Sequence, residues 1–354
     1  MPDKRIPVAI LGATGNVGQR FVQLLEHHPW FRVAELVASD RSAGKRFDEA
    51  TDWRLGPNMP EGVRGLTVLD YDADIQSPIA FSGLPGEVAG EIEQRLAANG
   101  QAVLSNTSTH RMEPDVPLMI AEVNADHAAA IAQQRANRGW KGYIVTNANC
   151  SAIHLTLALK PLSDAFGIDA VLVTTMQAVS GAGYPGVPSL DAIDNVVPFI
   201  SNEEEKLETE SQKMLGGWSA EGGFAPADFV LSAHCNRVAV RDGHMEAVSI
   251  RFRQTATPDE VMDVFEAFRG KPQELGLPSA PPQPIVVRRE QNRPQPIMDR
   301  DTHAGMASVV GRVRPCPLLG TKFVVLGHNT IRGAAGASIL NAELLKVEGL
   351  LPTS

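Results

Sequence analysis

The 354-residue sequence predicts an α/β protein with a doubly wound parallel sheet in residues 1–149 and an α+β domain with a mixed sheet in residues 150–330. The chain is longer than the length at which one hydrophobic core stops growing, which favours two domains. In its first part, short apolar runs alternate with segments of helical apolar spacing, as in parallel strands joined by helices. After residue 150, strand-like runs follow one another through short turns, which favours mixed or antiparallel pairing.

The apolar patterns give the expected elements in chain order. In the first domain we expect strands at Pro7–Leu11, Phe31–Ser39, the start of Ile79–Pro85 and Ala102–Ser105, and helices at Asn16–His27 and Gly86–Asn99. In the second we expect strands at Asp169–Ala178, Ala227–Leu231, Asn236–Val240, His244–Arg253 and Ser308–Val313, an irregular proline-rich segment at Leu277–Pro296 and a helix at Thr330–Leu351. Right-handed crossovers bring the carboxyl ends of parallel strands to one edge of a sheet, where ligands bind.

The composition is that of an ordinary globular protein, with 43% hydrophobic and 21% charged residues. A net charge of −9 argues against nucleic acid or anionic membranes as partners. The three cysteines are widely spaced, which predicts neither a disulfide framework nor a metal site. We expect a cytoplasmic protein, because a reducing compartment fits this cysteine usage and neither a signal peptide nor a membrane-spanning run is evident.

Three glycines, Gly12, Gly15 and Gly18, follow the first expected strand and open the next helix. Lacking side chains, they permit a tight turn and let a pyrophosphate approach backbone N–H groups. Their spacing is a variant of the common fingerprint, and a purely structural turn is the alternative. We predict a Rossmann-like dinucleotide site. The residues expected to contact the cofactor here are Gly12, Thr14, Gly15, Asn16 and Val17.

The segment after the second expected strand indicates which dinucleotide binds. An NAD site usually offers a carboxylate there to the ribose hydroxyls. This chain instead has Ser39, Arg41, Ser42 and Lys45, whose hydroxyls and cations suit the 2′-phosphate of NADP. Asp40 would repel that phosphate if it pointed inward, and a solvated polar loop is the alternative interpretation.

The segment Asn147–Ser151 joins two apolar runs. Asn149 has the chemistry of a helix N-cap, and the residues after it have helical spacing, so Cys150 should lie on the first turn of a helix. Free backbone N–H groups and the helix dipole favour an anion there, which predicts a sulfur biased toward thiolate. Such a sulfur can attack an acyl group.

A base for this thiol is expected in Asn236–Val248, which has the pattern of a hairpin with Asp242 and Gly243 at its turn. The register of such a hairpin puts Arg237 and His244 on one face of the sheet. His244 is the best base, since the pKa of an imidazole lies near neutral. Taken singly, the two residues could equally be a surface charge and a turn residue.

Three further segments carry polar side chains of the right kind. Glu203 and Lys206 share a helix face and could hold a zwitterion, or form a solvated ion pair. The hydroxyls of Ser105–Thr109, together with Arg111, suit an oxyanion such as phosphate. The glycine-rich loop Ser180–Gly186 is either a plain loop or a backbone surface against a nicotinamide.

Together these motifs resemble the aspartate-β-semialdehyde dehydrogenase family, in particular its archaeal and fungal branch. The resemblance runs nearly end to end. It is carried by the glycine loop at 12–18 and by segments 39–45, 105–112, 147–151, 180–188, 203–206, 237–244 and 329–336.

The resemblance implies a role for each candidate residue. Cys150 would be the nucleophile, His244 the acid/base and Gln177 the residue that orients the acyl group. Arg237 would bind the substrate α-carboxylate, Glu203 or alternatively Glu204 the α-amino group, and Arg111 and Lys206 the phosphate, with Asn106 nearby. Asn329 would reach the nicotinamide, and Ser82, Gly181 and Gly183 would also contact the cofactor. The family implies a homodimer or homotetramer built through the second domain, and a C-terminal helix, 331–354, that completes the first.

The implied reaction begins with attack of the Cys150 thiolate on L-aspartyl 4-phosphate, which expels phosphate. The thioester accepts hydride from NADPH, and the thiohemiacetal collapses to L-aspartate 4-semialdehyde as His244 returns a proton. This reaction lies on the route to lysine, threonine and methionine.

Other activities remain as alternatives at this point. Reductases of N-acetylglutamyl phosphate or malonyl-coenzyme A share the chemistry, but neither substrate offers an ammonium group to Glu203. A thiol hydrolase would not need the glycine loop. A non-catalytic NADP-binding regulator would not need the cysteine, the histidine and the cationic residues together.

Overall fold

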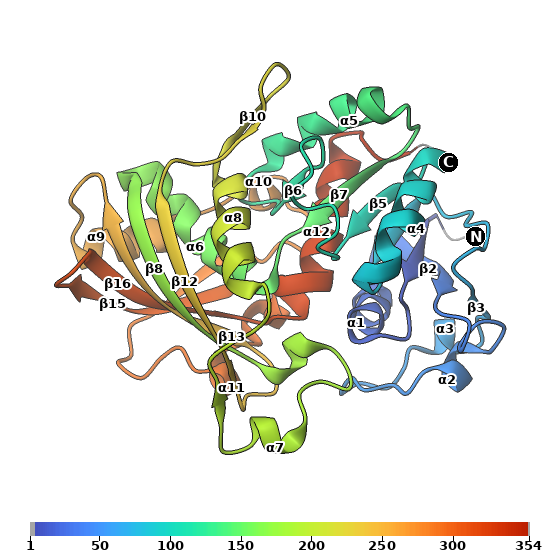
Figure 1. Ribbon diagram of the computed structural model, residues 1–354, viewed down its shortest axis with the longest axis horizontal. Helices are drawn as coiled ribbons and strands as arrows, with labels where there is room; N and C mark the ends of the chain where they lie inside the picture. Colours follow the sequence, from blue (N-terminus) through green and yellow to red (C-terminus); the bar gives the residue numbers. More distant parts are fainter. Residues whose placement is uncertain (1–3, 353–354) are drawn as a thin grey trace.

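A computed structural model describes residues 4–352 and contains two seven-stranded sheets on opposite sides of the molecule (Figure 1). The first sheet has the order β3-β2-β1-β4-β5-β7-β6, and its strands pair in parallel. These strands are β1 (Ile6–Leu11), β2 (Phe31–Val37), β3 (Val68–Leu69), β4 (Ile79–Ser82), β5 (Ala102–Ser105), β6 (Leu118–Met119) and β7 (Tyr143–Asn147).

Helices cover both faces of the first sheet. Val8 and Ile10 of β1 belong to a core that includes α1 (Asn16–Leu25), while Ala9 and Leu11 belong to a core that includes α4 (Gly86–Asn99). Neighbouring residues of a strand point to opposite faces, so the two helices lie on opposite sides of β1. The predicted doubly wound arrangement is confirmed, and α4 begins and ends where the sequence predicts.

The C-terminal helix α12 (Gly336–Val347) also packs on the first sheet, because its Ile339, Leu340 and Leu344 belong to the same core as β1 and α1. The π-helical segment η4 (Ile331–Ala335) precedes it. There Arg332 donates to both oxygens of Glu122 at 3.0 and 2.7 Å, and both side chains are fully buried. These contacts hold η4 and α12 against the first half of the chain.

The second sheet has the order β14-β15-β16-β13-β8-β12-β9. Its strands are β8 (Ile168–Gln177), β9 (Val196–Val197), β12 (Val230–Val238), β13 (His244–Phe252), β14 (Ile285–Arg288), β15 (Ser308–Cys316) and β16 (Gly320–Gly327). Two pairings are parallel and the rest antiparallel, so the sheet is mixed, as predicted. Helices α6 (Cys150–Phe166), α8 (Glu203–Leu215) and α9 (Pro258–Ala267) pack on it, and α8 lies between the two sheets (Figure 1).

Several predicted bounds in this half are wrong. The two strands expected between residues 227 and 240 form one strand, β12, and the segment expected to be irregular contains β14. Strand β16 was not predicted. The expected hairpin between residues 236 and 248 does not exist, because β12 and β13 do not pair with each other. They flank β8 on opposite sides.

Shorter elements complete the described chain. They are α2 (Phe47–Ala50), α3 (Glu61–Arg64), η1 (Ala125–Ala129), α5 (Ala130–Arg138), η2 (Val179–Ala182), α7 (Ser189–Ala192), β10 (Gly217–Ser219), β11 (Gly223–Ala225), α10 (Lys271–Glu274), α11 (Pro296–Asp299) and η3 (Thr302–Gly305). Between residues 4 and 352, none of the helices combines the length and the apolar character needed to cross a membrane.

Candidate active site

A cavity of about 570 Å³ lies between the two halves of the chain and is lined from both. We call it the central cavity. Twelve of the predicted site residues line it: Asn16, Val17, Asn106, Arg111, Cys150, Gln177, Gly181, Gly183, Glu203, Lys206, Arg237 and Asn329.

Cys150 is the first residue of α6, as predicted. The Asn149 side chain accepts hydrogen bonds from the backbone N–H groups of Ser151 and Ala152 at 3.0 and 3.2 Å, so it caps this helix. Gly333 packs against the cysteine, and a Cβ atom there would lie 3.0 Å from the Cβ atom of Cys150. The cap and this close contact fix the sulfur at the wall of the central cavity.

The predicted bias of the Cys150 sulfur toward thiolate is not found in the unliganded protein. Burial raises the pKa of the Cys150 thiol to about 12, and the carboxylate of Glu203 adds to the rise. Arg111 and Arg237 lower this pKa, but their effect is smaller than that of burial. The helix N-terminus therefore does not decide the charge of this sulfur in the unliganded protein, where the thiol is neutral at physiological pH.

Gln177, Arg237 and His244 lie side by side at one end of the second sheet. Arg237 on β12 is in register with Gln177 on β8, and His244 follows on the opposite side of β8. Arg237 and His244 share a face of the second sheet, as predicted, although the predicted hairpin is absent. The chain beyond β8 pairs with the segment that joins β12 to β13, because Val179 and Ser180 donate backbone hydrogen bonds to the carbonyls of Val240 and Arg241.

The His244 side chain is fully buried next to the central cavity. Its Nδ1 accepts a hydrogen bond from the Ala178 N–H group at 3.1 Å, so the neutral ring carries its proton on Nε2. Nε2 itself has no hydrogen-bond partner within residues 4–352. Burial and the nearby Arg237 hold the pKa of His244 well below its usual value. In the resting protein His244 is thus neutral and presents its Nε2–H as a hydrogen-bond donor, while its role as acid/base stays a prediction.

A glycine is required above these two side chains. A Cβ atom on Gly181 would lie 2.9 Å from Nη1 of Arg237 and 3.0 Å from Nε2 of His244. The loop after β8 can therefore cross the guanidinium and the imidazole only with glycine here. Its Ser180 hydroxyl accepts from Nδ2 of Asn329 at 2.8 Å, and Oδ1 of Asn329 accepts from the Gly243 N–H group at 2.8 Å.

The carboxylate of Glu203 on α8 accepts hydrogen bonds from three side chains at the wall of the central cavity. It accepts from Nζ of Lys206 at 3.2 Å, from Nδ2 of Asn149 at 3.0 and 2.9 Å, and from Nε2 of Gln177 at 3.2 Å. Glu204 points elsewhere and accepts from the backbone N–H group of Cys235. Of the two glutamates considered, the geometry favours Glu203 as the cavity residue.

Arg111 reaches the central cavity from the loop after β5. Its Nη1 donates to Oε1 of Glu210 at 2.9 Å, and its Nη2 donates to the carbonyl oxygen of Asn106 at 2.8 Å. Its Nε is buried and has no partner in the described part of the chain. The guanidinium is held by two of its nitrogens, and further N–H groups remain to bind an anion.

The glycine turn between β1 and α1 is tightly packed. Gly12 has φ 74°, and a Cβ atom on it would lie 2.6 Å from the carbonyl oxygen of Gly83. A Cβ atom on Gly18 would lie 2.2 Å from the carbonyl oxygen of Gly12. The N-cap residue of α1, Gly15, offers no side-chain acceptor, so the first-turn N–H groups remain open to an anion.

The remaining predicted residues lie outside the lining of the central cavity. Ser39, Arg41, Ser42 and Lys45 follow the end of β2, and Nζ of Lys45 donates to the carbonyl oxygen of Arg41 at 2.7 Å. The carbonyl of Val37 accepts from Gly12 and Ala13, so this loop begins beside the glycine turn. Gly12, Thr14 and Gly15 form the turn itself, and Ser82 is buried at the end of β4.

Glu210, which supports the site, was not predicted. It lies on α8, and with Glu203, Lys206 and Lys213 it forms a stripe with spacings of three and four residues. The spacing of seven between Lys206 and Lys213 already predicts a shared face, and the same helical spacing could have identified Glu210. Nothing in the sequence indicated that this face of α8 meets the first half of the chain.

Comparison with known proteins places this geometry among related enzymes. Residues 7–131 match the NAD-binding domain of semialdehyde dehydrogenases, and residues 159–332 match their dimerisation domain. Aspartate-semialdehyde dehydrogenase of Methanothermobacter thermautotrophicus is 53% identical over 96% of this chain and 99% of its own length. The corresponding protein of Schizosaccharomyces pombe is 47% identical over 97% and 99%. The crystal structure of the Candida albicans enzyme with NADP has a TM-score of 0.90 and 42% identity, covering 98% of this chain and 100% of its own.

Proposed function

This chain belongs to the aspartate-semialdehyde dehydrogenase family, and we propose that it reduces L-aspartyl 4-phosphate to L-aspartate 4-semialdehyde through a thioester on Cys150. It is an NADP-dependent oxidoreductase. The observation that carries the proposal is that the nucleophile, the charged side chains for the substrate and the end of the glycine turn line one cavity. The reaction would serve the synthesis of lysine, threonine and methionine.

The charges on the cavity wall match those of an aspartyl group. Arg237 would bind the α-carboxylate, since its Nη1 is held by the carbonyl oxygen of Ala178 at 2.8 Å and other N–H groups remain. Glu203 would bind the α-ammonium group, and Arg111 and Lys206 the phosphate. A malonyl or N-acetylglutamyl group lacks the ammonium and would leave Glu203 without that partner.

Substrate binding would help to activate the thiol. The carboxylate of Glu203 raises the pKa of Cys150, and an ammonium group bound to Glu203 would offset that effect. The phosphate leaves with the electron pair of its bond to the acyl carbon, and the thiol proton goes with it, so that it departs as hydrogen phosphate. Arg111 and Lys206 would stabilise the charge that builds up on this leaving group.

The tautomer of His244 suits a hydrogen bond to the reacting oxygen. Its Nε2–H would donate to the acyl oxygen as that atom gains negative charge, and would stabilise the charge that develops there. Gln177 lies next to it in the sheet and would orient the acyl group. Both residues are buried, so water would not compete for these contacts.

The first half of the chain fits the dinucleotide. The open first turn of α1 would hold the pyrophosphate, and the cations Arg41 and Lys45 would face the 2′-phosphate. Asn329, Gly181 and Gly183 line the cavity near Cys150 and would contact the nicotinamide end. When bound, the nicotinamide supplies the hydride that reduces the thioester. On this basis residues 1–149 and 331–354 would form the cofactor domain, and residues 150–330 the catalytic domain.

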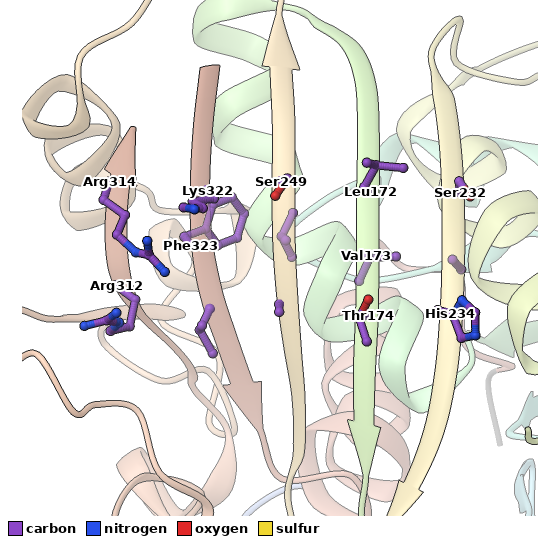
Figure 2. Close-up of a pocket in the computed structure, with 14 residues that line it drawn as sticks. Leu172, Val173, Thr174, Ser232, His234, Ser249, Arg312, Arg314, Lys322 and Phe323 are labelled. Carbon is purple, nitrogen blue, oxygen red and sulfur yellow. The ribbon is translucent and has the colours of Figure 1, made fainter. Parts of the chain in front are cut away.

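The outer face of the second sheet would form the contact between subunits. A depression of about 400 Å³ on this face is lined by residues of β15, β16, β13, β8 and β12, among them Leu172, His234 and Lys322 (Figure 2). Leu172 and Val230 are exposed apolar side chains on the same face. The match of residues 159–332 to a dimerisation domain supports self-association, and we infer a cytoplasmic homodimer or a homotetramer built from it.

An absorbance assay tests the proposed activity. The purified protein, given aspartate semialdehyde, inorganic phosphate and NADP⁺, should form NADPH in the reverse direction. NAD⁺ in a parallel reaction gives the cofactor preference, and omission of phosphate should stop the reaction. The proposal is wrong if neither nicotinamide cofactor is reduced.

A further inference from the structure

Glu210 on α8 joins two parts of the site that lie far apart in the sequence. Its Oε1 accepts from Nη1 of Arg111 at 2.9 Å, and its Oε2 accepts from the backbone N–H group of Asn149 at 2.6 Å. Arg111 belongs to the loop after β5, whereas Asn149 caps the helix that begins with Cys150. A single carboxylate therefore spans from the proposed phosphate-binding guanidinium to the residue before the nucleophile.

Glu210 does not take part in the chemistry directly. It is buried, and it is not among the residues that line the central cavity. Its two oxygens are already used by two donors, one of them charged. In a buried setting, removal of this carboxylate would leave Nη1 of Arg111 and the backbone N–H group of Asn149 without acceptors. Any effect of Glu210 on the reaction must therefore pass through Arg111 and Asn149.

Lys213, one turn further along α8, holds the same loop. Its Nζ donates to the backbone carbonyls of Arg111, Glu113 and Val116 at 2.7, 2.9 and 2.9 Å. The loop that carries Arg111 is thus fastened to α8 at two points, through the guanidinium by Glu210 and through the backbone by Lys213. With the loop backbone fixed in this way, Glu210 and the carbonyl oxygen of Asn106 together hold the guanidinium of Arg111 in place, and Glu210 is the charged partner.

We propose that Glu210 is a positioning residue that sets the place of the phosphate-binding guanidinium of Arg111 relative to the sulfur of Cys150. This inference rests on the proposed function, because it takes the ligand of Arg111 to be phosphate. Addition of the sulfur to the acyl carbon and expulsion of phosphate require the leaving group and the sulfur to be held in one fixed geometry. The Glu210 carboxylate binds Arg111, on the side of the leaving group, and Asn149, next to the sulfur, and so meets this requirement.

The proposal is tested with Glu210→Ala and Glu210→Gln, and with Glu205→Ala as the matched control on the exposed side of the same helix. In the assay with aldehyde, phosphate and NADP⁺, Glu210→Ala should raise the KM for phosphate at least about tenfold, while the KM for the aldehyde changes less than about twofold. Glu210→Gln keeps one acceptor oxygen and should lie between the wild type and Glu210→Ala. Glu205→Ala should match the wild type.

A second measurement needs no turnover. Inorganic phosphate should protect Cys150 from alkylation by iodoacetamide, and the concentration for half-protection should rise about tenfold or more in Glu210→Ala. Unfolding midpoints and NADP⁺ binding show whether each variant is folded. If Glu210→Ala fails to fold, the KM and the half-protection concentration for phosphate are compared between the wild type and Glu210→Gln, which keeps the side-chain volume.

The inference is overturned if both variants keep the wild-type KM and half-protection concentration for phosphate. It is also overturned if the KM for the aldehyde rises as much as that for phosphate. A wild-type protein that reduces neither cofactor would instead contradict the proposed function.

Discussion

The two sheets of this protein contribute to the site in different ways. The first sheet is parallel, is buried on both faces and offers mainly backbone groups at the turn after β1. The second sheet is mixed, and it offers the side chains of Gln177, Arg237 and His244 from one end of its covered face. The first half should therefore be sensitive to added side-chain atoms, and the second to lost functional groups.

The largest expected effect comes from the nucleophile. Cys150→Ser should lower turnover at least about a thousandfold, or about 4 kcal/mol of barrier, because a hydroxyl is a far poorer nucleophile than a thiolate. NADP⁺ binding, measured by fluorescence, should survive, because the glycine turn is untouched. A variant that keeps more than about a tenth of the wild-type rate would contradict the covalent mechanism.

Gly18→Ala tests the other side of the comparison. Its added Cβ atom would lie 2.2 Å from the backbone oxygen of Gly12, so the turn must move. We expect NADP⁺ affinity to fall about a hundredfold, or about 2.7 kcal/mol, while alkylation of Cys150 by iodoacetamide keeps its rate. Gly62→Ala is the control, since nothing lies within 4 Å of a Cβ atom there. Equal loss in both variants would show that the turn has no special role.

Arg237→Leu should affect the substrate but not the phosphate. Loss of a charge-assisted bond to the α-carboxylate should raise the KM for the aldehyde about thirtyfold, or about 2 kcal/mol. The KM for phosphate should stay within about twofold, because Arg111 and Lys206 are unchanged. Steady-state kinetics with each substrate varied in turn measures both values. Parallel rises in both would mean that Arg237 only holds the sheet together.

Glu246→Gln should have the smallest effect on rate and a distinct effect on stability. Glu246 lies two residues from His244 on β13, and neither of its oxygens has a partner in the described chain. Burial raises the pKa of this carboxyl well above its ordinary value of 4.5. A raised pKa means that the contribution of this carboxyl to stability is fully present below pH 4.5 and is lost as the pH rises through the folded-state pKa.

The glutamine variant lacks this titration. Its stability advantage over the wild type should be small near pH 4.5 and should grow with pH by up to about 1.4 kcal/mol per unit. Urea unfolding at several pH values measures the difference. Parallel curves for the two proteins would mean that Glu246 is ionised in the folded state, and that a polar partner compensates for its burial.

The first sheet was more predictable from the sequence than the second. Continuous apolar runs such as Val8–Leu11 mark strands that are buried on both faces, and local spacing then gives the helices between them. In the second sheet, the Asp-Gly pair at 242 and 243 suggested a local hairpin. The actual neighbour of both strands is β8, whose paired residues lie 60 or more positions earlier in the chain. A turn motif carries no information about such a distant strand.

The candidate site shows the same limit. Residue types and spacing identified Cys150, Arg237 and His244, and these lie together in the structure. The charge of the sulfur could not be predicted, because it depends on burial and on Glu203, which comes from another helix. The tautomer of His244 depends on one backbone N–H group, that of Ala178. Such contacts are set by the tertiary structure and leave no local pattern.

The place of α12 has a consequence for biosynthesis. The ribosome delivers β1 and α1 early, but Ile339, Leu340 and Leu344, which close the same core, emerge about 300 residues later. Until then the nascent chain exposes an apolar face that only its own last helix can cover. The core of the first half is therefore completed only after the second half, residues 150–330, has been synthesised.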